Sequence, residues 1–164
     1  MGNTSRVLDD VAWAILELLQ ENARLSYTEI GRRVGLSDTG VADRIQRLED
    51  AGIIRGYRVE LDAAAVGLPI LAFVRVNVYS SRLSGEQIES LIQAAPEVLE
   101  MHSMAGEECY LLKVAVSSIR HLDKFLLELW QANLVTATSI VLSSPVASRA
   151  INPAALARMT KPES

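Results

Sequence analysis

The sequence has little of what an exported or membrane-bound protein needs. It holds a single cysteine, Cys109, which excludes an internal disulfide and a cluster of thiolate metal ligands. No uninterrupted apolar run reaches the roughly 18 residues that a membrane-spanning helix requires. The stretch "MGNTSRVLDD" at the start contains no apolar segment of the signal-peptide type. We therefore expect a cytoplasmic protein that has no contact with a membrane.

The sequence also lacks the motifs of an enzyme. It contains no phosphate-binding loop, no Ser-His-Asp set and no paired-carboxylate site. His102 and His121 are too far apart in sequence to form a spaced pair of metal ligands. Trp13 and Trp130 lie on apolar helical stripes, where we expect them to be core residues. We predict no catalytic residue, no metal and no cofactor.

Positive charge is scarce overall, since 16 lysines and arginines face 20 acids and the net charge is −4. An acidic chain argues weakly against nucleic-acid binding, because a polyanion is held by local positive charge. The distribution of charge favours nucleic-acid binding, because residues 24–58 hold seven arginines and five acids and so carry a local net charge of +2. With 164 residues, of which 49% are hydrophobic, the chain suits one medium domain or two small ones.

Residues 9–51 are predicted to form three helices, the last two joined by about three residues. Ser26 and Glu29 have the spacing of a capping box at the start of the second helix. Gly35 is expected to end that helix, and Ser37 to cap the third. Gly31, one turn before the break, has no side chain and lets the two helices approach closely. This is the geometry of a helix-turn-helix.

The third predicted helix has an apolar stripe centred on Val41 and a polar row on the opposite side. In the major groove an arginine reads guanine and a glutamine reads adenine, so we assign Arg47 and Gln46 to base edges. Ser37, at the helix start, is placed for a phosphate. The candidate DNA-binding residues are Arg32, Arg33, Ser37, Thr39, Arg44, Gln46 and Arg47.

An alternative for the same helix is a solvated face with ordinary salt pairing. Asp43 and Arg47 are one turn apart, at the spacing of a helical ion pair. Asp38 and Asp43 also fit poorly beside DNA, because carboxylates repel phosphates.

The second half of the chain alternates as β-α-β-β-α-β, which predicts a split βαβ sandwich with both helices on one face of the sheet. Its open face would carry Phe73, Tyr79 and Leu111, which are too apolar to remain in water. We therefore expect a homodimer. The predicted strands are residues 70–79, 97–104, 109–116 and 134–143, and the helices begin at Ser84 and Ser118.

These elements divide the chain into four parts. Residues 1–60 form the DNA-binding domain, and its last stretch, residues 53–61, has the alternation of a strand or short hairpin. Residues 61–69 form a hinge, residues 70–151 the second domain and residues 152–164 a frayed C-terminal tail. The predicted fold class is α+β.

The sequence resembles the Lrp/AsnC family of transcriptional regulators over residues 8–151. The motifs that carry the resemblance are Gly35-Leu36-Ser37, Val41, Arg44, Arg47-Leu48-Glu49, Gly52, Ile54, Gly56-Tyr57, Ala72-Phe73-Val74, Val76, Pro96-Glu97-Val98, Thr136, Thr138 and Ile140-Val141-Leu142. The resemblance implies an N-terminal winged helix-turn-helix that binds double-stranded DNA. It also implies a ferredoxin-like βαββαβ domain that senses a small effector, usually an amino acid, and dimers that assemble into tetramers or octamers.

The resemblance also implies an effector site near the turn between the second and third strands. Gly106 exposes backbone N–H groups that can hold a carboxylate, and Glu107 or Glu108 can pair with an ammonium group. An ordinary hairpin turn with exposed acids is the alternative. The implied positions are Met104, Ala105, Gly106, Glu107, Glu108, Cys109 and Tyr110, with Leu134, Thr136 and Thr138 on the facing strand.

Two positions depart from the family pattern. Cys109 stands where the family has an aspartate, and the glycine that commonly precedes the last strand is replaced around Asn133-Leu134.

Two other functions are compatible with this architecture. One is a metabolite-sensing partner that has no operator of its own and acts through mixed oligomers. The other is a tetrapyrrole enzyme, since some proteins of this architecture resemble sirohaem decarboxylases and use histidine and arginine; here His102 and Arg75 would take those roles. The arginine-bearing helix pair favours the DNA-binding regulator over both.

Overall fold

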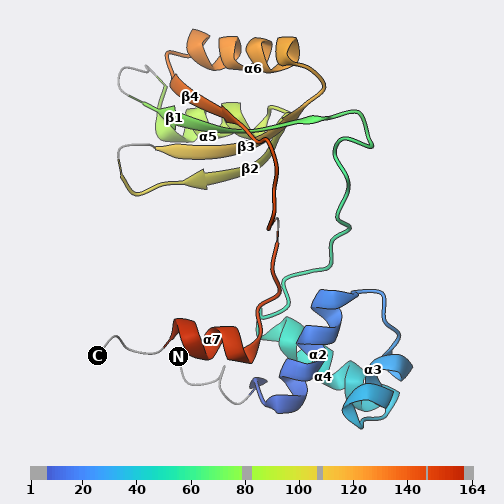
Figure 1. Cartoon of the computed structure of the whole chain (residues 1–164). Helices are drawn as coiled ribbons and strands as arrows, with labels where there is room; N and C mark the ends of the chain where they lie inside the picture. Colours follow the sequence, from blue (N-terminus) through green and yellow to red (C-terminus); the bar gives the residue numbers. More distant parts are fainter. Residues whose placement is uncertain (1–6, 79–82, 107–108, 147, 161–164) are drawn as a thin grey trace. The chain divides into compact units, whose positions relative to one another are not determined.

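The structure is a computed structural model that describes residues 7–78, 83–106, 109–146 and 148–160 (Figure 1). These residues form two compact units. The first contains the residues up to Val59 and those from Val146 onward, and the second spans Glu60–Pro145. The C-terminal segment thus belongs to the first unit by its contacts.

The first unit contains the three predicted helices, α2 (Asp10–Glu21), α3 (Tyr27–Val34) and α4 (Asp38–Asp50). Gly35 ends α3 in the left-handed conformation, with a φ of 73°. Ser37 caps α4, because its hydroxyl accepts a hydrogen bond from the Gly40 N–H at 3.2 Å. The helix-turn-helix prediction is confirmed.

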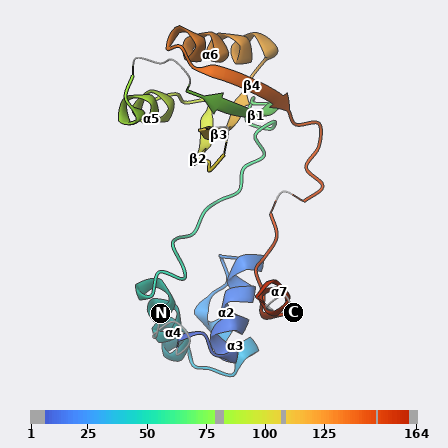
Figure 2. The same cartoon turned by 90° about the vertical axis from the view of Figure 1, so that its left-hand side faces the viewer.

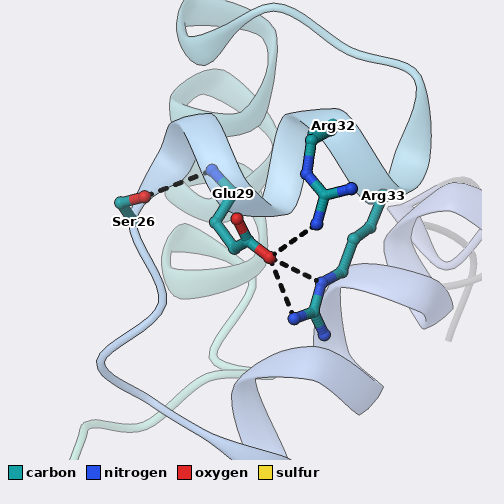
Figure 3. A network of polar contacts seen from close by, with 4 residues as sticks. All are labelled: Ser26, Glu29, Arg32 and Arg33. Carbon is teal, nitrogen blue, oxygen red and sulfur yellow. Dashed lines mark hydrogen bonds and ion pairs between the residues drawn. The ribbon is translucent and has the colours of Figure 1, made fainter.

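The N-cap of α3 differs from the predicted capping box. The Ser26 hydroxyl accepts from the Glu29 N–H at 3.2 Å, which is one half of the box. The Glu29 carboxylate does not reach back to the Ser26 N–H but binds Arg32 and Arg33 instead (Figure 3). Two guanidinium groups attract the carboxylate more strongly than one amide N–H does. The prediction was therefore right for Ser26 and wrong for the Glu29 side chain.

The turn between α3 and α4 depends on Gly31. A Cβ on this residue would lie 2.4 Å from the Leu36 carbonyl oxygen, which is main chain and has no freedom to rotate away. The Leu36 N–H donates to the Gly31 carbonyl at 3.0 Å across the same gap. This contact brings α3 and α4 together over a core of buried apolar side chains: Ile15, Ile30, Val41 and Ile45.

The strand or hairpin predicted for residues 53–61 is not formed. The described chain there passes from a turn into an extended segment without strand pairing. Tyr57, Val59 and Leu61 alternate as expected, yet they are 50%, 84% and 68% exposed. A strand exists only with a neighbouring backbone to bond, and no neighbouring segment of the described chain supplies one.

The expected frayed tail is instead partly a helix, α7 (Pro153–Met159). Asn152 caps it by accepting from the Ala155 N–H at 2.8 Å, and Pro153 stands at the first helical position, where proline is favoured. Gln20 of α2 binds the preceding residue twice: its Nε2 donates to the Ile151 carbonyl and its Oε1 accepts from the Ile151 N–H, both at 2.9 Å. In both views α7 lies beside α2 (Figure 2).

The second unit has the predicted order of elements and an antiparallel sheet with the strand order β2-β3-β1-β4. Helices α5 and α6 pack on one face of this sheet, so the split βαβ prediction is confirmed. The elements are β1 (Ile70–Asn77), α5 (Gly85–Gln93), β2 (Val98–Ser103), β3 (Tyr110–Val116), α6 (Ile119–Gln131) and β4 (Val135–Ile140).

The side chains of β1 alternate between the two faces of the sheet. Ala72, Val74 and Val76 are fully buried under the helices, whereas Phe73 on the open face is 38% exposed. Leu111 on β3 is half-buried. The third residue predicted for the open face, Tyr79, lies outside the described residues.

The close approach at Gly31 generates a stability prediction. We expect Gly31→Ala to lower the free energy of unfolding by about 1–3 kcal/mol, because the new methyl group collides with a main-chain oxygen. Thermal unfolding followed by circular dichroism measures the change. Gly85→Ala is the matched control, since a Cβ there meets nothing within 4 Å and we expect little effect. Equal melting temperatures for the two variants would contradict the role given to Gly31.

Candidate functional site

The outward side of α4 has the arrangement expected from the sequence. Val41, Ile45 and Leu48 are buried in the first unit. The polar residues on the other side, Ser37, Thr39, Gln46 and Arg47, are all exposed. Because the buried stripe fixes the rotation of the helix, the polar row has one defined direction.

The two arginines of α3 share one carboxylate (Figure 3). Oε1 of Glu29 accepts from Arg32 Nη2 at 2.9 Å, from Arg33 Nε at 3.1 Å and from Arg33 Nη2 at 3.0 Å. The hydrogen bonds from Arg32 and then Arg33 lower the pKa of Glu29, which is therefore charged at neutral pH. Two positive charges and one negative charge leave a net positive cluster on the surface.

The reading residues of α4 are also engaged within the helix. Arg47 Nη2 lies 2.7 Å from Asp43 Oδ2, with 62% of the arginine side chain exposed. Gln46 Nε2 donates to Asp50 Oδ1 at 2.9 Å. The ion pair considered as the alternative from sequence is thus present. It does not exclude DNA contact, because a guanidinium group has five N–H donors and this ion pair involves a single nitrogen, Nη2.

Arg44 has a different environment from the other arginines of the helix pair. It pairs with Asp9, the N-cap residue of α2, and only 31% of its side chain is exposed. The Ala12 N–H and then the Arg44 guanidinium lower the pKa of the Asp9 carboxyl. This pair connects the start of α2 to the middle of α4, so Arg44 contributes to the packing of the three helices.

Three further arginines of the first unit were counted in the local charge but not chosen as site residues. Arg24, Arg55 and Arg58 are exposed and form no ion pair among the described residues. They line one groove of about 980 Å³ together with Trp13 and Tyr57. Helix periodicity could not identify them, because they lie in irregular segments.

In the second unit, the two segments of the predicted effector site meet at one end of the sheet. Val76 of β1 pairs with Tyr110 of β3 on one side and with Thr136 of β4 on the other. The Cys109 N–H donates to the Val76 carbonyl at 3.0 Å, and the Met104 N–H donates to the Cys109 carbonyl at 2.9 Å. One strand therefore separates the turn from the start of β4, which corresponds to about 10 Å between their backbones.

The predicted effector residues differ in how accessible they are. Met104 is 43% exposed, Ala105 and Thr138 are exposed and Thr136 is half-buried. Gly106 has a φ of 145°, which a residue with a Cβ rarely adopts. Leu134 is only 2% exposed and belongs to the core.

The remaining predicted effector positions contribute less to an open site. Tyr110 is 8% exposed, and its hydroxyl donates to Glu89 Oε1 at 3.3 Å. Burial and then the Glu89 carboxylate raise the pKa of Tyr110. Cys109 is half-buried against the core, and Glu107 and Glu108 lie outside the described residues.

Trp130 was predicted to be a core residue and is instead 48% exposed. Its indole N–H donates to the Thr136 hydroxyl at 2.7 Å, so the ring is held over the start of β4. It lines a hollow of about 420 Å³ together with Asn133, Leu134, Val135 and Thr136. Hydrophobic periodicity placed Trp130 on the α6 stripe but could not show that the indole extends past the end of the core.

Asn133 accounts for one departure from the family pattern. Its φ is 57°, the left-handed conformation that glycine adopts most easily and that asparagine tolerates. Its N–H donates to the Trp130 carbonyl at 2.9 Å and closes the turn into β4. The asparagine therefore keeps a glycine-like turn at this position.

The two histidines lie in separate contacts. His121 Nε2 is 2.8 Å from Glu97 Oε1, and His102 Nε2 is 3.3 Å from Glu100 Oε2. Within the described ranges, no three His, Cys, Asp or Glu side chains are grouped to hold a metal ion. Among the described helices, none is long and apolar enough to cross a membrane.

Two protein-family models match the chain. A model of winged helix-turn-helix DNA-binding domains matches residues 8–55, and a model of the Lrp/AsnC ligand-binding domain matches residues 71–151. The HTH-type transcriptional regulator LrpC of Bacillus subtilis is 34% identical over 119 residues, which is 73% of this chain and 81% of LrpC.

Solved structures show the same fold. A transcriptional regulator of Neisseria meningitidis in complex with L-methionine has a TM-score of 0.81 at 32% identity, covering 88% of this chain and 96% of that one. A feast or famine regulatory protein of Mycobacterium tuberculosis complexed with L-methionine also has a TM-score of 0.81, at 31% identity, covering 89% of this chain and 99% of that one.

Proposed function

The chain belongs to the Lrp/AsnC family of DNA-binding transcriptional regulators, and on that premise we propose that it reads a specific DNA sequence with α4 and responds to an amino-acid effector. Like its relatives, it is a transcriptional regulator and not an enzyme. The observation that carries the proposal is the fixed direction of the polar row on α4. We propose that it acts in the cytoplasm.

The DNA contacts divide into base and backbone contacts. We propose that Arg47 and Gln46 reach base edges in the major groove, and that Ser37 and Thr39 contact a phosphate at the N-terminal end of α4. Arg32 and Arg33 would contact the adjacent backbone. Arg44 would reach a phosphate only with the N–H groups that its pair with Asp9 leaves free. The full set is Arg32, Arg33, Ser37, Thr39, Arg44, Gln46 and Arg47.

We also propose an amino-acid effector that binds at the end of the sheet where the turn at residues 104–110 and the start of β4 meet. The exposed backbone at Gly106 suits a carboxylate. Asn77, the last residue of β1, supports the site: its Oδ1 is buried and has no hydrogen-bond partner within the described chain. Such a group is open to a donor. The L-methionine complexes of two structural neighbours favour an amino acid of this kind.

The assembly that we propose is a homodimer formed through the open face of the sheet, with further association into tetramers or octamers. Phe73 at 38% exposure and Val135 at 51% lie on the outer side of paired strands and would be covered in such a dimer. A dimer would present two copies of α4, which suits half-sites about one helical turn apart or multiples of that spacing.

The second candidate is a sensing partner that binds the effector but no operator of its own. The internal pairing of Arg32, Arg33 and Arg47 favours it, because each of these residues already has an acidic neighbour. It differs from the main proposal in one outcome: the protein would retain no DNA fragment although it binds an amino acid.

The choice of reading face leads to a DNA-binding prediction. Fragments retained by the protein from random DNA should share a sequence, and Arg47→Ala should bind that sequence about tenfold to hundredfold more weakly, because a bidentate contact to guanine contributes about 1–3 kcal/mol. Mobility shift at fixed salt measures the change. Arg120→Ala removes the same charge from the second unit and is the control. If the two variants bind equally well, α4 does not read DNA with Arg47.

The effector site leads to a separate prediction. Calorimetry with the common amino acids should detect heat for at least one of them, with L-methionine as the first candidate, and native mass spectrometry should show a change in oligomer size. Gly106→Ala should weaken this binding, because a Cβ strains the backbone at a φ of 145°. Gly85→Ala serves as the control. No heat and no change in oligomer size with any amino acid would exclude the proposed effector.

A further inference from the structure

The arginines of the helix pair and those outside it differ in their neighbours. Arg32, Arg33 and Arg47 each lie within 3.0 Å of a carboxylate of the same helix. Arg24, Arg55 and Arg58 are exposed and form no such pair among the described residues. The acids thus accompany the residues proposed to touch DNA. An acid beside a phosphate-binding arginine opposes binding, so its presence at this surface needs an explanation.

We propose that Glu29 and Asp43 are internal competitors of the DNA phosphates, an inference that rests on the proposed DNA-binding function. Glu29 weakens the sequence-independent attraction of α3 for any duplex. Asp43 keeps Arg47 directed along the reading face of α4, so that Asp43 is a specificity-determining residue that acts through Arg47.

The geometry at Glu29 supports the first part. One oxygen accepts three hydrogen bonds from two guanidinium groups, at 2.9, 3.1 and 3.0 Å. These contacts engage guanidinium N–H donors that a phosphate oxygen would otherwise accept from. The carboxylate is not needed for the N-cap, because the Ser26 hydroxyl binds the backbone N–H of Glu29 and not its side chain. The carboxylate charge can therefore be removed while the cap is kept.

The geometry at Asp43 supports the second part. The pair with Arg47 spans 2.7 Å and uses one guanidinium nitrogen, Nη2, which leaves the other donors for a base edge. At a cognate site Arg47 can keep this pair and still bind guanine in the planar geometry that its fork requires. At an arbitrary site Arg47 can offer the same free donors to a phosphate, but the Asp43 carboxylate then lies close to the DNA and opposes that contact.

Ordinary helix stabilisation is the competing explanation for these pairs. Exposed pairs at this spacing stabilise a helix only slightly. If that were their only role, removing the acid would change the melting temperature slightly and leave the affinity for DNA as it is. Affinity for DNA therefore separates the two explanations.

The test compares Glu29→Gln with the wild-type chain on a short duplex of random sequence across a salt series. Each phosphate that the protein neutralises adds about 0.9 to the magnitude of the slope of log K against log salt. We expect a slope that is steeper by about 0.9 and binding that is about fivefold tighter at 0.15 M salt. The control is Glu17→Gln, which changes the net charge equally on α2, where Glu17 is exposed and forms no ion pair within the described residues.

Asp43→Asn tests the specificity part with the sequence selected by the wild-type protein. We expect tighter binding to the random duplex and a smaller ratio between selected and random affinities. If Glu29→Gln and Glu17→Gln bind the random duplex alike and Asp43→Asn keeps the wild-type ratio, the inference is overturned while the DNA-binding function stands. If the wild-type chain and all the variants bind no duplex at low salt, the proposed function itself fails, and the inference fails with it.

Discussion

The direction of α4 depends on a contact between two stretches of main chain. The Leu36 N–H donates to the Gly31 carbonyl at 3.0 Å, and a side chain on Gly31 would meet the Leu36 carbonyl oxygen at 2.4 Å. Because this gap holds no side chain, the turn at Gly35 can place Ser37 at the start of α4. Val41 and Ile45 then reach the core, and the polar row is left on the outside. The proposed reading of DNA has no meaning without this contact.

Charge on this surface is balanced locally. Glu29 and Asp43 lie beside the arginines that we assign to DNA, which agrees with an overall charge of −4 in a DNA-binding chain. A surface of this kind binds any single duplex weakly, so that effective binding depends on base contacts and on several protomers acting together. The proposed dimer and the balanced charge thus have a joint consequence: specificity comes from the base contacts of α4 and from the number of protomers bound to the DNA.

The sequence predicted best the features that depend on local chemistry. Ser26, Ser37, Ser84 and Ser118 all cap the expected helices, and the alternation of Ala72 and Val74 identified the buried face of β1. Features that depend on distant partners were missed. The Glu29 carboxylate binds two arginines instead of completing the capping box. The Trp130 side chain is exposed, and its indole N–H donates to Thr136. Helix α7 forms beside a bond to Gln20, which is 131 residues away from Ile151.

The presentation of α4 to a duplex is the central claim, and site-specific photo-crosslinking tests it most directly. A photoreactive residue in place of Gln46 should crosslink to the selected DNA. The same residue in place of Gln93, which is exposed on α5 of the second unit, should not. Crosslinks from position 93 and none from position 46, in a protein that still binds the DNA, would show that the outward row of α4 does not face the duplex.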